Sequence, residues 1–183
     1  MRMIILMLLL VTIAAGCLIN SNSFQKTYFY PLPYRASVAQ YARANNLNPN
    51  LVAGVILAES KFVPQAKSPL GAIGLMQIMP QTANWIAEQT GEKEFKTTHL
   101  NDPEVNMRLG TWYLASLKQE FNSNEVLMLA AYNSGRGNVK QWMQEYKWDM
   151  AFNEPDKIPF PETRDYVKKV LKNKEHYQKL YNL

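Results

Sequence analysis

One glutamate, Glu59, lies where a charged side chain is not expected. It is the last of four residues that recur at intervals of three and four, and so share one face of a predicted helix, namely Val52, Val55, Ile56 and Glu59. Because burial disfavours the ionised form of a carboxyl group, a glutamate at the end of this apolar stripe should hold its proton more tightly than an exposed one. Such a group can act as a general acid near neutral pH. The same pattern also fits a boundary glutamate that reaches solvent or pairs with Lys61.

Three later blocks hold polar side chains that could surround this acid. Ser68 is followed by the glycine-punctuated stretch GAIGLMQIMP at 71–80, and much later come AAYNSGRGNV at 130–139 and PETRDYV at 161–167. Together with the Glu59-Ser pair, the order and wording of these blocks resemble the lytic transglycosylase family. In that family a Glu-Ser pair ends a helix, and Gly-Leu-Met-Gln, Ala-Tyr-Asn and Glu-Thr-x-x-Tyr-Val follow in turn. The resemblance covers roughly residues 34–183.

The resemblance implies a single catalytic residue. Most glycosidases use two carboxylates, one to protonate the leaving oxygen and one to stabilise the oxocarbenium-like centre. Here the resemblance offers only Glu59, and no aspartate follows it before Asp102. In the family the 6-hydroxyl of muramic acid attacks the anomeric carbon and gives a 1,6-anhydro product, so Glu59 would act first as an acid and then as a base. The implied substrate is the MurNAc-GlcNAc β-1,4 bond of peptidoglycan.

The resemblance also implies seven substrate-binding residues, which are Ser68, Met76, Gln77, Tyr132, Asn133, Glu162 and Tyr166. In the family the serine hydrogen-bonds the sugar or the acid, the Met-Gln pair lines the groove, and the late tyrosine stands beside the catalytic glutamate. The glutamine suits an N-acetyl group. A purely structural interpretation remains open for five of them: the serine could stabilise a turn, the methionine and the first tyrosine could be core, the asparagine could cap a helix, and Glu162 could be a favourable first-turn charge.

Two other functions fit the same residues. One is a hydrolytic muramidase on the same fold, in which water replaces the 6-hydroxyl; its products would be one water heavier than anhydro ends. The other is a cell-wall-binding lipoprotein that kept the fold and lost activity. The presence of Glu59 together with the polar residues argues against the second, because a protein that only binds has no need of an acid.

The amino-acid composition excludes several other classes of protein. A chain of 183 residues suits one domain, and 47% hydrophobic against 19% charged residues argues against disorder. The net charge of +5 is spread along the chain with no run of more than two basic residues, which argues against nucleic-acid binding. The only histidines, His99 and His176, form no cluster with the single cysteine, and there is no P-loop or GxGxxG, so we expect neither a metal nor a cofactor. We expect a monomer.

The N-terminal residues have the features of an export signal. In residues 1–16, a positive charge at Arg2 precedes an apolar run from position 3 to 15 and a small-residue exit. The apolar run is shorter than the roughly 20 residues that span a bilayer, which argues against a mature transmembrane helix. Cys17 follows directly, as in the bacterial lipobox whose cysteine becomes lipidated, although Ala14 replaces the usual leucine. We therefore expect an exported envelope protein anchored to the membrane by lipid, with plain secretion or an uncleaved anchor as alternatives.

The remaining chain is expected to form one mainly α, lysozyme-like domain. Residues 17–33 would be a lipid-anchor tether without a fold of its own and an aromatic strap, and residues 34–183 the catalytic domain. The aromatics at 28–34 are expected to pack against that domain. A small loop or hairpin should follow the catalytic helix because Gly71 and Gly74 permit positive φ, and Gly135 and Gly137 should form a later turn. Helices are predicted at 37–46, 49–59, 80–90, 103–121, 124–132, 138–146 and 162–181.

Overall fold

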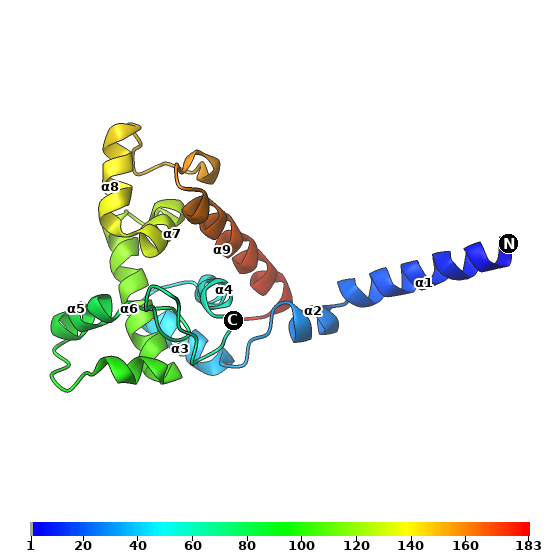
Figure 1. Cartoon of the computed structure of the whole chain (residues 1–183), viewed down its shortest axis with the longest axis horizontal. Helices are drawn as coiled ribbons and strands as arrows, with labels where there is room; N and C mark the ends of the chain where they lie inside the picture. The colour runs from blue at the N-terminus through cyan, green and yellow to red at the C-terminus, as the bar shows by residue number, and fades with distance from the viewer. Residues whose placement is uncertain (1) are drawn as a thin grey trace.

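The structure is a computed structural model that describes residues 2–183, without the side chains at positions 2, 3, 5, 6 and 14. Met1, where the expected export signal begins, lies outside the described residues, as do the side chains of Arg2 and Ala14. The elements are α1 (Arg2–Asn20), α2 (Asn22–Tyr28), α3 (Arg35–Ala44), α4 (Pro49–Glu59), α5 (Pro80–Thr90), η1 (Thr97–Asn101), α6 (Pro103–Glu120), α7 (Glu125–Ser134), α8 (Arg136–Glu145), η2 (Pro155–Lys157) and α9 (Pro161–Leu180). The mainly α prediction is confirmed (Figure 1).

Helix α4 lies at the centre of the domain, and α9 packs along it (Figure 1). Seven consecutive residues of α4, from Asn50 to Ile56, are buried, as expected for a helix surrounded by others. Gly54 allows the close approach of α9, because a Cβ there would lie 3.0 Å from the Val170 carbonyl oxygen. The Asn173 amide donates to the Gly54 carbonyl at 3.2 Å and fixes the two helices in register. Helix α4 is therefore held along its length.

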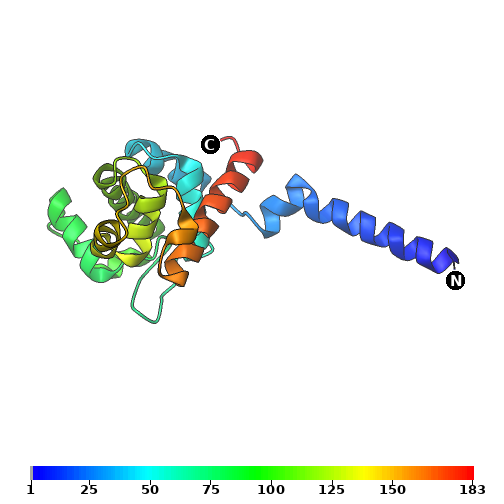
Figure 2. The same ribbon diagram turned by 90° about the horizontal axis from the view of Figure 1, so that it is seen from above.

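The loop between α4 and α5 contains the predicted small hairpin. Single antiparallel bridges join Lys67 to Ile73 and Ile73 to Ile78, and the loop projects from the body of the domain (Figure 2). Gly74 has φ +82, and a Cβ there would meet the Asn106 amide nitrogen at 2.1 Å, so only glycine fits. The base of the hairpin is thus pressed directly against α6.

Buried Asn106 of α6 fastens that base. Its amide nitrogen donates to the carbonyls of Ile73 and Leu100, each at 2.9 Å, and its oxygen accepts the Met76 backbone N–H at 2.8 Å. Its relative exposure is zero, so these three bonds replace water for an amide that would otherwise be unsatisfied. One side chain therefore sets the position of the loop relative to the helices.

Most predicted helices end within two residues of their observed bounds. Asn48, Asp102 and Asn124 each cap the following helix by accepting backbone N–H bonds, and Gly91 ends α5 in the left-handed conformation. One prediction was wrong: α8 begins at Arg136, so Gly137 lies inside the helix and Gly135 alone, at φ +91, makes the turn. The 3₁₀ helices η1 and η2 were not predicted.

The N-terminal segment differs from the predicted unstructured tether. Helix α1 runs through Cys17, which is exposed, and α2 occupies much of the expected tether; both extend away from the domain (Figures 1 and 2). Among the described residues, no single helix is both long and apolar enough to cross a membrane. The pair 7–20 and 22–28 meets those criteria together but bends by 66°.

The aromatic strap joins this segment to the domain. The ring of Tyr30 stacks on His176 with centroids 4.4 Å apart, and the hydroxyl of Tyr177 donates to the Pro31 carbonyl at 2.8 Å. The prediction that strap aromatics pack against the domain is confirmed for Tyr30 and Tyr34, whereas Tyr28 and Phe29 remain exposed.

Candidate active site

Glu59 is the last residue of α4, and the chain turns sharply after it. Lys61 and Phe62 both adopt left-handed backbone conformations, with φ of +52 and +63. Such conformations are strained for non-glycine residues and persist where packing holds them. The Phe62 side chain is buried in the core and supplies that packing. The carboxylate is therefore delivered at a fixed helix end rather than on a mobile loop.

The carboxyl group of Glu59 is poised between its two protonation states near neutral pH. The residue is partly buried, with its carboxyl group largely withdrawn from water, and this desolvation raises its pKa from 4.5 to about 7. The Tyr166 hydroxyl and the charge of Lys169 lower the pKa, but by less than desolvation raises it. The prediction of a glutamate that keeps its proton agrees with this environment, and neither solvent exposure nor pairing with Lys61 describes it.

Two tyrosines flank the acid from different helices. The Tyr166 hydroxyl of α9 is buried and makes no hydrogen bond of standard geometry with the described residues, yet it lies close enough to Glu59 to influence its pKa. The Tyr132 hydroxyl of α7 donates to the Met76 carbonyl at 2.7 Å. Burial raises the pKa of both tyrosines well above 10, and the charge of Glu59 raises them further. Both phenols therefore remain neutral donors beside the acid.

The hairpin residues divide into a buried and a groove-facing set. Met76 was predicted to line the groove, and this was wrong: its side chain is fully buried and fills the space that Gly110 leaves on α6. Gln77 does line the groove, with φ +48 and its amide nitrogen held by the carbonyls of Ala66 and Gly74 at 3.0 and 2.9 Å. Because both N–H bonds are directed to backbone, its amide oxygen is the group left for a ligand.

A groove of about 260 Å³ is lined by the hairpin and by helices α5, α6 and α7. Its lining residues are Gln77, Ile78, Met79, Thr82, Tyr113, Tyr132, Asn133, Ser134 and Gly135. Six of these were not predicted as site residues, namely Ile78, Met79, Thr82, Tyr113, Ser134 and Gly135. The signal that could have found Met79 is its place between Gln77 and the helix-opening Pro80, and the residue is 39% exposed.

The other predicted residues are only partly gathered here. Asn133 lines the groove at the end of α7, as predicted. Ser68 accepts the Ala72 backbone N–H at 3.0 Å, which is the turn-stabilising role. Glu162 is exposed in the first turn of α9 and does not line the groove. No cluster of three or more histidine, cysteine or acidic residues that could hold a metal exists among residues 2–183 as described.

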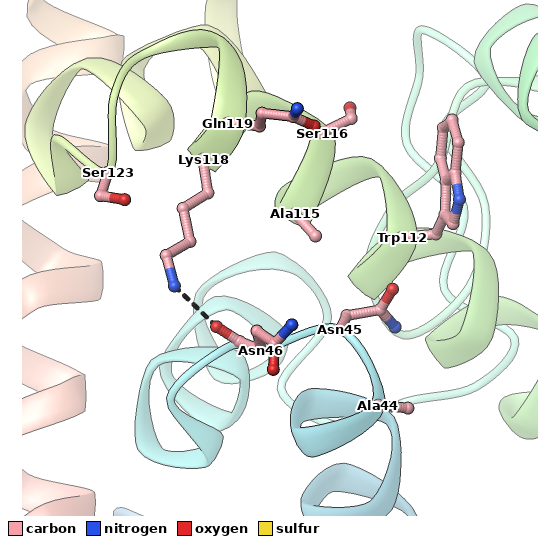
Figure 3. Close-up of a pocket in the computed structure, with 9 residues that line it drawn as sticks. All are labelled: Ala44, Asn45, Asn46, Trp112, Ala115, Ser116, Lys118, Gln119 and Ser123. Atoms are coloured by element: carbon pink, nitrogen blue, oxygen red, sulfur yellow. Dashed lines mark hydrogen bonds between the residues drawn. The ribbon is translucent and has the colours of Figure 1, made fainter.

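A larger hollow lies elsewhere. It has about 510 Å³ and lies between the α3–α4 turn and one face of α6, with Asn45 and Asn46 on one wall and Trp112 and Lys118 on the other (Figure 3). The Lys118 amine donates to the Asn46 carbonyl at 2.6 Å across it. None of its lining residues shifts the pKa of Glu59, so size alone would have selected the wrong site.

The fold and the site define a small lysozyme-like helical domain with one proton-holding glutamate at a helix end beside a groove. Residues 36–154 match the family model of the transglycosylase SLT domain, and residues 157–183 match the soluble lytic transglycosylase helical domain. The chain belongs to the SLT transglycosylase family.

Named relatives agree with this membership. A soluble lytic murein transglycosylase of Salmonella typhimurium is 36% identical over 151 residues, covering 81% of this chain and 23% of the relative. The membrane-bound lytic murein transglycosylase C of Actinobacillus pleuropneumoniae is 33% identical over 165 residues, covering 79% of this chain and 45% of the relative.

A solved structure is similar across nearly the whole chain. The lytic transglycosylase Slt of Pseudomonas aeruginosa, in a form described as an inactive glutamate-to-glutamine mutant, has a TM-score of 0.74 at 31% identity. The matched region covers 93% of this chain and 29% of the Pseudomonas aeruginosa chain. The chain thus spans about a quarter of the length of the first relatives it matches.

Proposed function

We propose that the protein is a peptidoglycan lytic transglycosylase in which Glu59 is the only acid and base. The observation that carries the proposal is the desolvated carboxyl group of Glu59, whose pKa is about 7. Its charge acts on Tyr132, which lines a groove of polar and aromatic side chains. No other carboxylate of the described residues influences the pKa of Glu59, whereas a partner at the roughly 5 Å spacing of retaining glycosidases should. Family membership and the names of the relatives support the same activity.

In the proposed reaction, protonated Glu59 gives its proton to the glycosidic oxygen while the C1–O bond breaks. The 6-hydroxyl of the same muramic acid then bonds to C1, and Glu59 takes up the hydroxyl proton. No water is consumed, and Glu59 returns to its protonated form. At pH 7 about half of the molecules carry the proton at the start, which is suitable for a group that must both donate and accept.

We assign the surrounding residues the following roles. The Gln77 amide oxygen accepts the N–H of an N-acetyl group, and Asn133 and Met79 contact sugar in the groove. Tyr166 donates a hydrogen bond to ionised Glu59 and stabilises the intermediate in which the proton has left. Ser68 and Glu162 are substrate-binding residues on the family pattern alone; Ser68 stabilises its turn and Glu162 is exposed.

The products of digested sacculi test the proposal. We expect muropeptides with 1,6-anhydro ends, one water lighter than reducing ends, by mass spectrometry. A hydrolytic muramidase on the same fold would give reducing ends, and that result would refute the transglycosylase assignment. A chain that binds sacculi without releasing any muropeptide would instead be a wall-binding protein.

For location, we propose an exported protein that is anchored at Cys17 by lipid and acts on glycan strands near the membrane as a monomer. The support is the lipobox-like order of residues around Cys17, its exposure, and a relative that is named membrane-bound. Two acyl chains suffice for stable anchoring, whereas one gives only marginal binding. The test is mass spectrometry of the mature N-terminus, and an unmodified product that begins after Cys17 would end this part of the proposal.

A further inference from the structure

Three aromatic side chains form an exposed cluster at the end of helix α2. The ring centroid of Phe24 lies 4.6 Å from that of Tyr28 and 5.8 Å from that of Phe29, and we call these three residues the aromatic cluster. Tyr28 is 68% exposed and Phe29 is 51% exposed. Contiguous exposed apolar side chains mark sites of interaction with a protein or a membrane. The aromatic cluster is therefore a candidate interaction surface.

The domain does not cover the aromatic cluster, because the opposite face of α2 is fixed to the end of α9. Lys26 comes two residues after Phe24, which places it about 200° further round the helix. Its amine lies 5.0 Å from the ring centroid of Tyr181, at the distance of a cation–π contact. The hydroxyl of Tyr181 also donates to the Tyr30 carbonyl at 2.8 Å. With one face held beside α9 (Figure 1), α2 presents the aromatic cluster away from the domain.

The chain just before the aromatic cluster indicates what covers it. Helix α1 ends at Asn20, two residues before α2 begins, and its apolar side chains are exposed, with Leu18 at 60% and Ile19 at 45%. Phe24 lies seven residues after Cys17, a reach of at most about 25 Å when the segment is extended. A bilayer that holds a lipid on Cys17, or α1 itself, is therefore within reach of the aromatic cluster.

The charge at this end of the domain suits a bilayer that contains anionic lipids. No acidic residue occurs in α1, α2 or the strap, and Lys26 is exposed. Lys172 and Lys179 of α9 are also exposed, and both lower the pKa of His176, whose ring stacks on the strap. Glu175 is the one acidic side chain that influences the same histidine. Basic groups therefore outnumber acidic ones where α2 meets the domain, and anionic headgroups attract them.

Resting on the proposed membrane anchor, we propose that the aromatic cluster enters the headgroup layer of a bilayer that contains anionic lipids. Aromatic rings are favoured at this depth, where the ring contacts lipid and a tyrosine hydroxyl remains hydrated. Because Tyr181 fixes α2 to α9, the contact also orients the domain. Tyr166, which lies close to Glu59, comes fifteen residues before Tyr181, or about 22 Å along the helix. Glu59 therefore stays at a set distance from the membrane contact.

A tryptophan placed in the aromatic cluster measures its depth. The full chain with Phe29→Trp is reconstituted in vesicles of phosphatidylethanolamine and phosphatidylglycerol, with bromine on the upper part of the acyl chains. The signal of the wild-type chain, whose four tryptophans all lie in the domain, is subtracted. We expect the added emission to shift to the blue and to be quenched by bromine, and to be quenched less in vesicles of phosphatidylcholine alone.

The matched control is Tyr146→Trp. Tyr146 is 47% exposed, close to the 51% of Phe29, and it follows α8, which lies away from α2 in both views (Figures 1 and 2). Its emission should be the same in brominated and unbrominated vesicles. Quenching of the two variants to the same extent would mean that the domain has no fixed orientation on the bilayer, and that result overturns the proposal.

The same measurement in a Cys17→Ser background separates this proposal from the lipid anchor. Quenching of Phe29→Trp that persists there supports the aromatic cluster as a membrane contact even if mass spectrometry finds no lipid on Cys17. Emission that bromine leaves unchanged, in a chain that does carry the lipid, overturns the proposal while the anchor stands, and it would leave the aromatic cluster free for another protein. A chain that sediments with neither kind of vesicle overturns it as well.

Discussion

The surroundings of two charged side chains, Glu59 and Arg136, differ in how far they shield the charge from water. At Glu59 the protein removes water and supplies no close cation other than Lys169, so the carboxyl pKa rises and the group can move a proton. At Arg136 of α8 the side chain is 38% exposed, and its guanidinium is held by the rings of Trp85 and Tyr113 and by Glu120. Desolvation changes the chemistry of a group, whereas a fixed, partly hydrated charge changes only affinity and specificity. Substitutions of Glu59 and of Arg136 should therefore affect different kinetic constants.

The largest effect should come from Glu59→Gln. The amide keeps the shape but cannot donate the proton, so release of anhydromuropeptides should fall by about 10²- to 10⁴-fold while binding of strands persists. Initial rates by chromatography of digested sacculi measure this. Glu175→Gln, a change at an exposed site on α9, serves as the control and should retain full activity. Wild-type rates in the Glu59→Gln enzyme would show that another group is the acid.

Asn106→Ala should cause the next largest change, and it acts through position rather than chemistry. The substitution leaves two carbonyls and one N–H without their partner, so the free energy of unfolding should fall by about 2 to 4 kcal/mol. Urea unfolding measures it, with the exposed Asn101→Ala as control. Because the loop that carries Gln77 loses its attachment to α6, activity should fall as well. A stable variant with normal activity would mean that α6 does not hold the hairpin.

Glu59→Gln should also stabilise the protein, in a way that depends on pH. The folded pKa of about 7 lies above the unfolded value of 4.5, so the contribution of Glu59 to wild-type stability is fully present below pH 4.5 and is lost as pH rises through 7. Glutamine removes that loss, and at pH 8 the variant should be more stable by about 1 to 3 kcal/mol. Denaturant unfolding at pH 4.5 and pH 8 gives the comparison; the two proteins should differ little at the lower pH. A gain of equal size at both would refute the desolvation cause.

The smallest predicted change is the pH response of Tyr166→Phe. The hydroxyl lowers the pKa of Glu59, so its loss should raise that pKa and move the alkaline limb of the activity profile to higher pH. The rate at the optimum should fall by at most about tenfold, the scale of one hydrogen bond to a charged group. Rates of strand cleavage from pH 5 to 9 test this. A limb that moves to lower pH would contradict the assigned contact.

Much of the helical order could be predicted from the sequence because its signals are local. Asn48-Pro, Asp102-Pro and Gly91 specify helix ends through caps and backbone geometry, and these ends appear where expected. The depth of a side chain was harder to predict. Met76 and Met79 have the same chemistry, and only packing against Gly110 determines that the first is core and the second is groove.

The cluster of two aromatic rings and one guanidinium beside the groove could not be predicted from the sequence. Trp85, Tyr113 and Arg136 come from three helices and have no periodic relation to one another. Their contact depends on how α5, α6 and α8 pack, which is a tertiary property. Glu59 could be singled out from the sequence because a charge on an apolar stripe is visible within one helix.

The most direct test of the central claim is a titration of the Glu59 carboxyl group itself. In protein labelled with carbon-13 at glutamate carboxyls, the resonance that is absent from Glu59→Gln can be followed by NMR from pH 3 to 9. We predict a single transition with a midpoint at about pH 7, well separated from the exposed glutamates. A midpoint near 4.5 would mean that the carboxyl is hydrated and ionised at neutral pH, and Glu59 could not then be the proton donor proposed here.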